Sequence, residues 1–93
     1  MTTHAIVSAT VTDPAAMEAY RARAGEALAK YGAAPVQVSN ELTLLEGDGE
    51  LPQFMVVLAF PDRDSALAWR NDPELAETHA LRQKGAKTTI TLL

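Results

Sequence analysis

The hydrophobic pattern of the chain is strongest at residues 54–60, where seven apolar residues, FMVVLAF, follow one another and end at Pro61-Asp62. Successive side chains of a strand point to opposite faces of its sheet, so a strand with this sequence has no polar side. We therefore expect residues 54–60 to form a strand in a sheet that is covered on both faces.

Three further stretches alternate between apolar and polar residues, as strands do. They span residues 4–12, 35–46 and 88–93. In the second of them, Asn40 lies on the apolar side, which indicates a bulge or a bend near this residue. The turn-forming sequence GDGELP at residues 47–52 then leads into the apolar run, so we expect the two strands that it joins to form an antiparallel hairpin.

The first helix is predicted between the first two strands. Asp13 is a suitable N-cap, and Pro14 occupies the first helical position, where its missing N–H has no cost. The helix should run to about Tyr31 and end at Gly32, because glycine tolerates the left-handed turn that ends many helices. Helical spacing places one apolar stripe on it: Met17, Tyr20, Ala24, Leu28 and Tyr31.

Two shorter helices are predicted after the apolar run. Asp62 is suited to cap the first of them, which carries Trp69. The dipeptide Asp72-Pro73 ends this helix and begins the next one, by the same device as at the first helix. The last helix should end at Gly85, just before the final strand.

The predicted elements follow the order strand, helix, strand, strand, helix pair, strand. This is the order of the ferredoxin-like βαββαβ fold, an α+β architecture with a four-stranded antiparallel sheet and helices on one face. We expect one such domain over residues 1–93. The helices cover one face of the sheet, and no element of the chain is left to cover the second.

A second copy of the chain would cover that face with its own sheet. We therefore predict a homodimer through the sheet face, with an interface of roughly 800 Å² per subunit. At about 25 cal/mol per Å² of apolar surface, half of that area contributes on the order of 10 kcal/mol before association entropy is subtracted. Dimerisation is thus expected to be part of folding.

Composition narrows the classes of function. The chain has 93 residues, a net charge of −4 and no cysteine, and its N-terminus, MTTH, lacks the basic start and apolar core of a secretory signal. We expect a soluble, cytoplasmic protein that neither spans a membrane nor binds nucleic acid. The sequence contains no phosphate-binding glycine loop, zinc-protease motif, nucleophile elbow or cysteine pair, so we predict no cofactor and no metal site.

Short motifs along nearly the whole chain resemble those of one family. They are VTDP at 11–14, YR at 20–21, KYG at 30–32, LEGD at 45–48, FP at 60–61, Ala66, Trp69, DPE at 72–74 and LR at 81–82. Together they resemble the DUF1330 family of small dimeric α+β barrel proteins, whose superfamily also contains cofactor-free monooxygenases and muconolactone-isomerase-like proteins. The resemblance implies the fold and the dimer, and it brings no agreed activity. The chain departs from the family pattern at Ala33-Ala34-Pro35, Arg70 and Leu75, which removes polar and aromatic groups from the predicted pocket rim.

Candidate site residues gather on the helices. His79 and Arg82 share a helix face with Leu75, by spacings of four and three residues, and together suit an anionic or enolisable small molecule. We predict Tyr20, Trp69 and Arg82 as ligand-binding residues and His79 as the catalytic acid–base group. The alternative is structural: a partly exposed histidine, an arginine that contacts the last carbonyls of its helix, and a tryptophan that anchors the core.

Two functions are open at this point. The first is a homodimer that binds a small organic molecule in an apolar pocket between sheet and helices, and that acts on it without a cofactor, as a monooxygenase or isomerase by analogy with the superfamily. The second is a non-catalytic dimerisation or binding module whose pocket is filled by its own side chains. Some dimeric α+β barrel proteins bind haem through a histidine near a tryptophan, so Trp69 and His79 add haem binding as a minor alternative.

Overall fold

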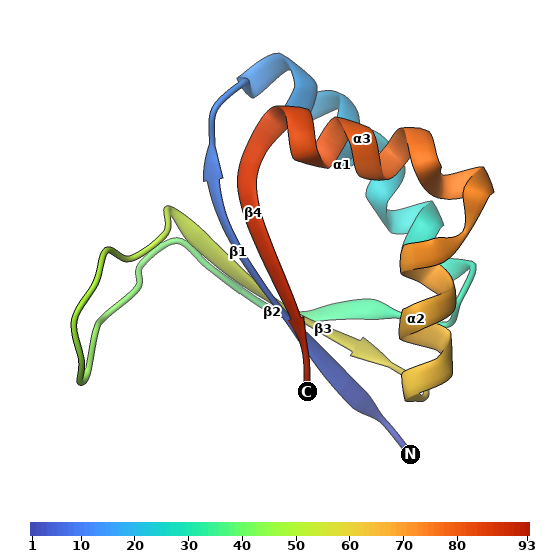
Figure 1. Cartoon of the computed structure of the whole chain (residues 1–93), viewed down its shortest axis with the longest axis horizontal. Helices are drawn as coiled ribbons and strands as arrows, with labels where there is room; N and C mark the ends of the chain where they lie inside the picture. The colour runs from blue at the N-terminus through green and yellow to red at the C-terminus, as the bar shows by residue number, and fades with distance from the viewer.

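The computed structural model describes the whole chain, Met1–Leu93, and contains four strands, three α-helices and one 3-10 turn. In chain order they are β1 (Thr3–Val11), α1 (Pro14–Ala29), β2 (Ala34–Ser39), β3 (Phe54–Phe60), α2 (Arg63–Asn71), η1 (Pro73–Leu75), α3 (Ala76–Gly85) and β4 (Ala86–Leu92). This order confirms the ferredoxin-like fold, with the helices packed against a strongly twisted sheet (Figure 1). None of the helices is long and apolar enough to cross a bilayer.

The four strands form one antiparallel sheet in the order β2-β3-β1-β4. The register places Val7 of β1 between Val56 of β3 and Ile90 of β4. Val7 is buried beneath the helices, whereas its neighbours Ile6 and Ser8, which point to the opposite face, are only half-buried. The alternation predicted for β1 is therefore confirmed, and one face of the sheet has no cover within the subunit.

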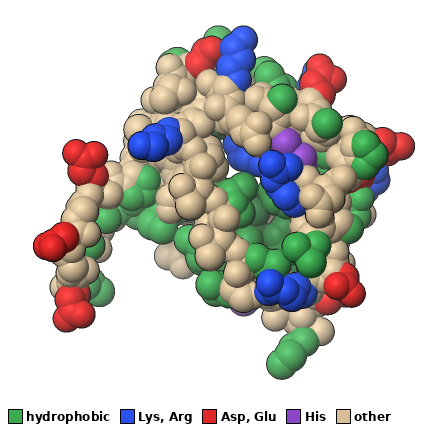
Figure 2. All heavy atoms as spheres, in the orientation of Figure 1, with side chains coloured by type: hydrophobic (Ala, Val, Ile, Leu, Met, Phe, Trp, Pro, Cys, Tyr) green, Lys and Arg blue, Asp and Glu red, His purple; other side chains and the backbone are tan.

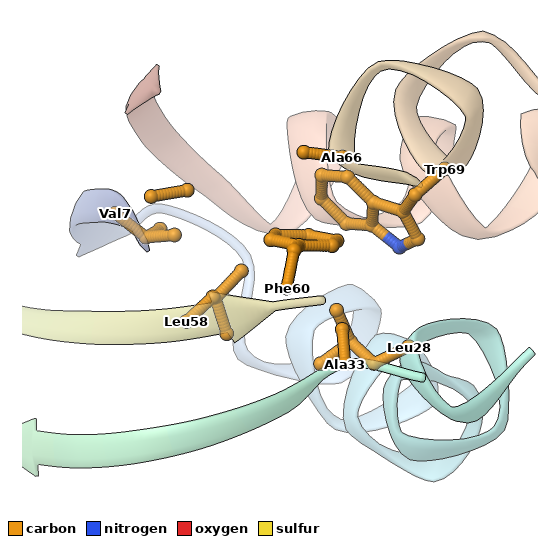
Figure 3. Packing of buried hydrophobic residues seen from close by; sticks show 8 residues of the cluster. Val7, Leu28, Ala33, Leu58, Phe60, Ala66 and Trp69 are labelled. Carbon is orange, nitrogen blue, oxygen red and sulfur yellow. The ribbon is translucent and has the colours of Figure 1, made fainter. Parts of the chain in front are cut away.

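The core lies between the sheet and the helices. Phe60, at the end of β3, is almost fully buried and packs against Trp69 of α2, with the two ring centroids 5.6 Å apart. Leu58 and Ala66 belong to the same cluster, and Figure 3 shows these side chains converging from the strand and the helix. The packing fixes the indole of Trp69 in place, which is the structural role that the sequence also suggested.

Three aspartates begin helical segments, as the sequence predicts. The carboxylates of Asp13, Asp62 and Asp72 each accept a hydrogen bond from a backbone N–H two or three residues further along, at 3.2, 2.7 and 2.8 Å. Asp72 also accepts 2.6 Å hydrogen bonds from Lys30 Nζ and the Tyr31 hydroxyl, just after α1. These partners lower the pKa of the Asp72 carboxyl to about 2, and the bonds fasten α1 to the junction between α2 and α3.

The second strand is shorter than the sequence predicted. β2 ends at Ser39 and not at Glu46, and its irregularity lies between Pro35 and Gln37, not at Asn40. Pro35 has no N–H to donate to the ladder, so the pairing is interrupted beside it. The predicted hairpin partner is confirmed, since β2 pairs antiparallel with β3.

The remainder of the predicted strand belongs to an arm, residues 40–53, that extends away from the sheet (Figure 1). At the base of the arm, the Gln53 N–H donates to Thr10 Oγ1 at 3.2 Å, and the Gln53 side-chain oxygen accepts from the Val11 N–H at 3.0 Å. Because Gln53 is bonded to β1, the chain before it is turned away from β2. Three leucines of the arm, Leu44, Leu45 and Leu51, are exposed, and Leu45 is 94% exposed.

Gly85 lies where the end of α3 meets the start of α1. A Cβ at this position would be 2.7 Å from the backbone nitrogen of Met17 and 2.9 Å from its Cα. The Gly85 carbonyl accepts hydrogen bonds from the N–H groups of Thr12 and Asp13, which hold the two segments together. Gly85→Ala should therefore destabilise the protein by about 1–3 kcal/mol, the usual cost of overpacking, as measured by urea unfolding.

Gly25 supplies the matched control. It lies within α1, and no atom is within 4 Å of a Cβ placed there. Gly25→Ala should stabilise the protein by about 0.5–1 kcal/mol, because alanine is the better helix former. Similar effects of the two substitutions would show that the short distance between position 85 and the Met17 backbone does not require glycine.

Candidate functional site

Two adjoining hollows lie between the sheet and the helices. The outer groove has a volume of about 570 Å³ and runs between α1 and the β2–β3 side of the sheet, and the inner cavity has about 70 Å³ and reaches α2 and α3. They share five lining residues: Met17, Tyr20, Phe54, Val56 and Leu58. Figure 2 shows a hollow between sheet and helices, with hydrophobic side chains at its floor and basic and histidine side chains beside it.

Arg82 of α3 brings a positive charge to the wall of the inner cavity. The residue is only 4% exposed, and no carboxylate forms an ion pair with it. Its guanidinium makes one hydrogen bond within the protein, from Nη1 to Nδ1 of His79 at 2.8 Å, so most of its N–H donors have no protein acceptor. A buried cation without a counter-charge is destabilising, and an anion that entered the cavity would offset this effect.

Both ring nitrogens of His79 are occupied. Nε2 lies 2.9 Å from the carbonyl oxygen of Trp69, which is only an acceptor, so Nε2 carries the proton and Nδ1 accepts the hydrogen bond from Arg82. Burial is the main cause that lowers the pKa of His79, and the charges of Arg82 and Arg70 act in the same direction. A neutral imidazole thus links the last turn of α2 to the guanidinium of Arg82.

Two aromatic rings complete the surroundings of the guanidinium. The Arg82 Cζ atom lies 5.7 Å from the ring centroid of Tyr20 and 5.3 Å from that of Trp69, within the range of cation–π interactions. The indole of Trp69 meets the imidazole of His79 edge-on, with centroids 4.8 Å apart. These contacts hold the guanidinium in one position, which is what a recognition site for a planar anion needs.

The structure brings the four predicted site residues together. Tyr20, Trp69 and Arg82 line the inner cavity, and His79 contacts both Trp69 and Arg82. Neither His79 nor Arg82 is a partly exposed surface residue, so the exposed position that the structural alternative assumed for His79 is wrong. The lining residues contributed by strands were not predicted from the sequence: Phe54, Val56, Leu58, Val7, Ala9, Thr88 and Ile90. The alternation within residues 54–60 contained the signal for the first three, because every second residue of β3 faces the helices.

The hydrogen bonds at both nitrogens of His79 affect two predictions made from the sequence, acid–base catalysis by this residue and haem binding. With no free nitrogen, the imidazole is better placed to position Arg82 than to act as the acid–base group that the sequence suggested. For the same reason it offers no ligand to a haem iron, so the residues present do not fit haem. No group of three or more histidine, aspartate or glutamate side chains is arranged to hold a metal ion.

The neutral state of His79 should make the protein less stable in mild acid. The imidazole of the unfolded chain titrates near a pKa of about 6.5, and the pKa in the folded protein is lower. The unfolded state therefore binds more protons as the pH falls below about 6.5, so stability is lost in that direction. Among the charged groups near the imidazole, Arg82 and Arg70 lower the pKa of His79, and only one carboxylate, that of Asp72, raises it.

His79→Gln should remove much of this dependence, because glutamine keeps one donor and one acceptor and does not titrate. The urea midpoint of the wild type should decline between about pH 7.5 and about pH 5, and the decline should be shallower in His79→Gln. His4→Gln, at the other histidine, should retain the decline of the wild type. An unchanged slope in His79→Gln would contradict the assignment.

Comparison with known proteins adds the family and the fold. A model of the DUF1330 family, a domain of unknown function, matches residues 2–93. No curated protein matches the sequence. SnoaB, a cofactor-independent oxygenase from Streptomyces nogalater, is 17% identical with a TM-score of 0.69, over 99% of this chain and 90% of that chain. The RPA0582 protein of unknown function from Rhodopseudomonas palustris is 18% identical with a TM-score of 0.78, over 99% and 80%.

At these identities, the two solved structures are evidence of a shared fold alone. They agree with the ferredoxin-like topology of the sheet and helices described above. The family model covers nearly the whole chain, and it confirms the resemblance carried by the short sequence motifs. The chain belongs to the DUF1330 family.

Proposed function

We propose that the protein binds a small organic anion, in the simplest case a carboxylate, at Arg82 in the inner cavity. The observation that carries this proposal is that Arg82 is buried and has no counter-charge in the protein. A carboxylate accepts two parallel hydrogen bonds from a guanidinium, so it would use donors that the protein leaves free. The Tyr20 hydroxyl, which has no hydrogen-bond partner in the protein, offers a further donor in the same cavity.

The apolar lining strengthens this interaction. Nine of the eleven residues around the inner cavity are hydrophobic, so a charge pair formed there is poorly screened by water. Arg82 is the only cation in this lining, so without it the inner cavity would not bind a small anion. Specificity for a negatively charged group therefore rests on Arg82 and on the groups that hold it.

The alternative of a non-catalytic module with a filled pocket predicts a solid interior. The outer groove, at about 570 Å³, is instead within the range of about 300–1,000 Å³ found for small-molecule sites. The open volume between α1 and the sheet is therefore the observation that favours ligand binding over a purely structural module.

The proposal includes a homodimer through the uncovered face of the sheet. The middle of this face is apolar and only half-buried in the single subunit, with Ile6 on β1 and Met55, Val57 and Ala59 on β3, and His4 and Ser8 lie on either side of Ile6 along β1. Thr89 and Thr91 of β4 give it a polar border. An apolar centre with a polar rim is the usual anatomy of a protein interface, and a second copy of the sheet would match it.

A second candidate is proton transfer on the bound compound without a cofactor. Solvent would take the proton from the carbon next to the carbonyl, and the Tyr20 hydroxyl and the Arg82 guanidinium, which share the cavity, would stabilise the negative oxygen of the resulting enolate. SnoaB, which shares the fold, is a cofactor-independent oxygenase. For a β-keto acid in D₂O, NMR should then show exchange of the protons next to the carbonyl above the buffer rate, and Tyr20→Phe should abolish the excess.

Calorimetric titration with octanoate and with octanamide tests the primary proposal. The two compounds differ in charge and share the same chain, so octanoate should bind at least tenfold more tightly if a charge-assisted bond of about 1.5–3 kcal/mol forms. Equal affinities, or no binding of any carboxylate at millimolar concentration, would refute the proposal. Added chloride should weaken octanoate only slightly, since the site is buried.

A further inference from the structure

We infer that the ligand is amphipathic: its carboxylate lies in the inner cavity at Arg82, and an apolar chain of several carbons follows the outer groove. The inference rests on the proposed function and specifies its substrate class. Tyr20 lines both hollows. It therefore lies between the inner cavity, which would bind the carboxylate, and the outer groove, which would bind the apolar chain.

Volume sets the first constraint. The inner cavity, at about 70 Å³, has roughly half the volume of a cavity of about 150 Å³ that holds one benzene molecule. It therefore accommodates a headgroup and no larger body. The outer groove is about eightfold larger (570 against 70 Å³), and it adjoins the headgroup position, because five side chains line both hollows.

The walls of the outer groove set the second constraint. Nine of its thirteen lining residues are hydrophobic, and α1 contributes Ala24 and Leu28 while the sheet contributes Val38. Among the polar residues, the amide oxygen of Gln53 is already bonded to the backbone of β1. The free hydrogen-bonding groups of the groove belong to Tyr20, Arg21 and Asn40, and the rest of the lining suits an alkyl or similar apolar chain.

Exposure on β2 supports the same conclusion. Val38 is 62% exposed and Val36 is 59% exposed, yet only Val38 lines the outer groove. An apolar chain laid in the groove would cover Val38 and leave Val36 as it is. Arg21, also in the lining, adds a positive charge near the opening and would favour the approach of an anion.

A series of straight-chain carboxylates tests the inference on the wild-type protein. Propionate, hexanoate and decanoate, each below its micelle concentration, should bind with affinities that rise about threefold to fourfold per methylene, since burial of each CH₂ contributes about 0.8 kcal/mol. Affinity independent of chain length, with binding retained, would overturn the inference and leave the proposed function intact. Failure of every carboxylate to bind would overturn both.

Two pairs of substitutions locate the chain. Ala24→Trp should fill the groove and remove most of the gain between hexanoate and decanoate while propionate still binds, whereas Ala22→Trp, on the exposed part of α1, should change neither. Val38→Ser should weaken decanoate several-fold, and Val36→Ser should not, which keeps the test valid if Ala24→Trp fails to fold. Equal responses within each pair would place the chain elsewhere and contradict the inference.

Discussion

Arg82→Met should abolish carboxylate binding and leave the protein folded. We expect the affinity for octanoate to fall by about 30-fold or more, because removal of one partner of a buried charge pair costs about 2–5 kcal/mol. We expect the melting temperature without ligand to equal or exceed that of the wild type, because methionine fills a similar space and removes a buried, unpaired cation. Calorimetry and thermal unfolding measure the two effects.

Opposing energies decide the sign of the change in stability. The substitution leaves Nδ1 of His79 without its donor, which costs about 1–3 kcal/mol, and it removes cation–π contacts with Tyr20 and Trp69 of about 0.5–2 kcal/mol. Burial of an ion carries a penalty of several kcal/mol even after relaxation. The desolvation penalty is at least comparable to the losses. We therefore expect Arg82 to serve binding without adding to the stability of the fold.

Arg23→Met is the matched control, because Arg23 is an exposed arginine of α1 that lines neither hollow. It should alter octanoate affinity by less than about threefold, as expected for a screened surface charge. A large drop in melting temperature for Arg82→Met, with octanoate affinity unchanged, would instead make Arg82 a structural residue of the core.

Val57→Asp should convert the protein from a dimer to a monomer. Val57 lies on the uncovered face of the sheet, directly opposite Ile6 of β1. A carboxylate there would be buried at the proposed interface next to its symmetry mate, and an uncompensated buried charge costs several kcal/mol. In sedimentation equilibrium the wild type should have twice the chain mass of 10.0 kDa, and the variant should have the single mass with a lower melting temperature.

Leu67→Asp controls for the added charge, because Leu67 is 45% exposed on α2, away from the sheet face. It should remain dimeric. A wild-type protein that sediments as a stable monomer at micromolar concentration would contradict the proposed dimer, although the ligand site lies on the other face of the sheet and would not be affected.

The local rules of the sequence predicted the fold well. The three capping aspartates, the glycine turn at Gly32 with its φ of 69° and the apolar strand 54–60 each depend on the chain within a few residues. The length of β2 depends on more distant partners. Pairing ends where Ser39 meets Met55, because the chain before Phe54 contains Pro52, which lacks an N–H, and Gln53, which is bonded to β1.

The candidate site was also predictable only where it depends on local helical spacing. Helical spacing placed His79 and Arg82 on one face of α3, and the structure confirms that they contact each other. The spacing did not reveal the third partner, the Trp69 carbonyl, which is free to accept because it lies in the last turn of α2. This bond fixes the tautomer of His79 and turns its other nitrogen to Arg82, which favours a positioning role, while acid–base chemistry at His79 stays a prediction.

A crystal structure of the protein with decanoate would show directly whether Arg82 is the anion site. We expect both carboxylate oxygens at about 2.7–2.9 Å from guanidinium nitrogens of Arg82, with the alkyl chain in the outer groove beside Ala24 and Val38. Decanoate bound at another surface, while Arg82 keeps His79 as its sole polar partner, would contradict the claim that this buried charge is the anion site.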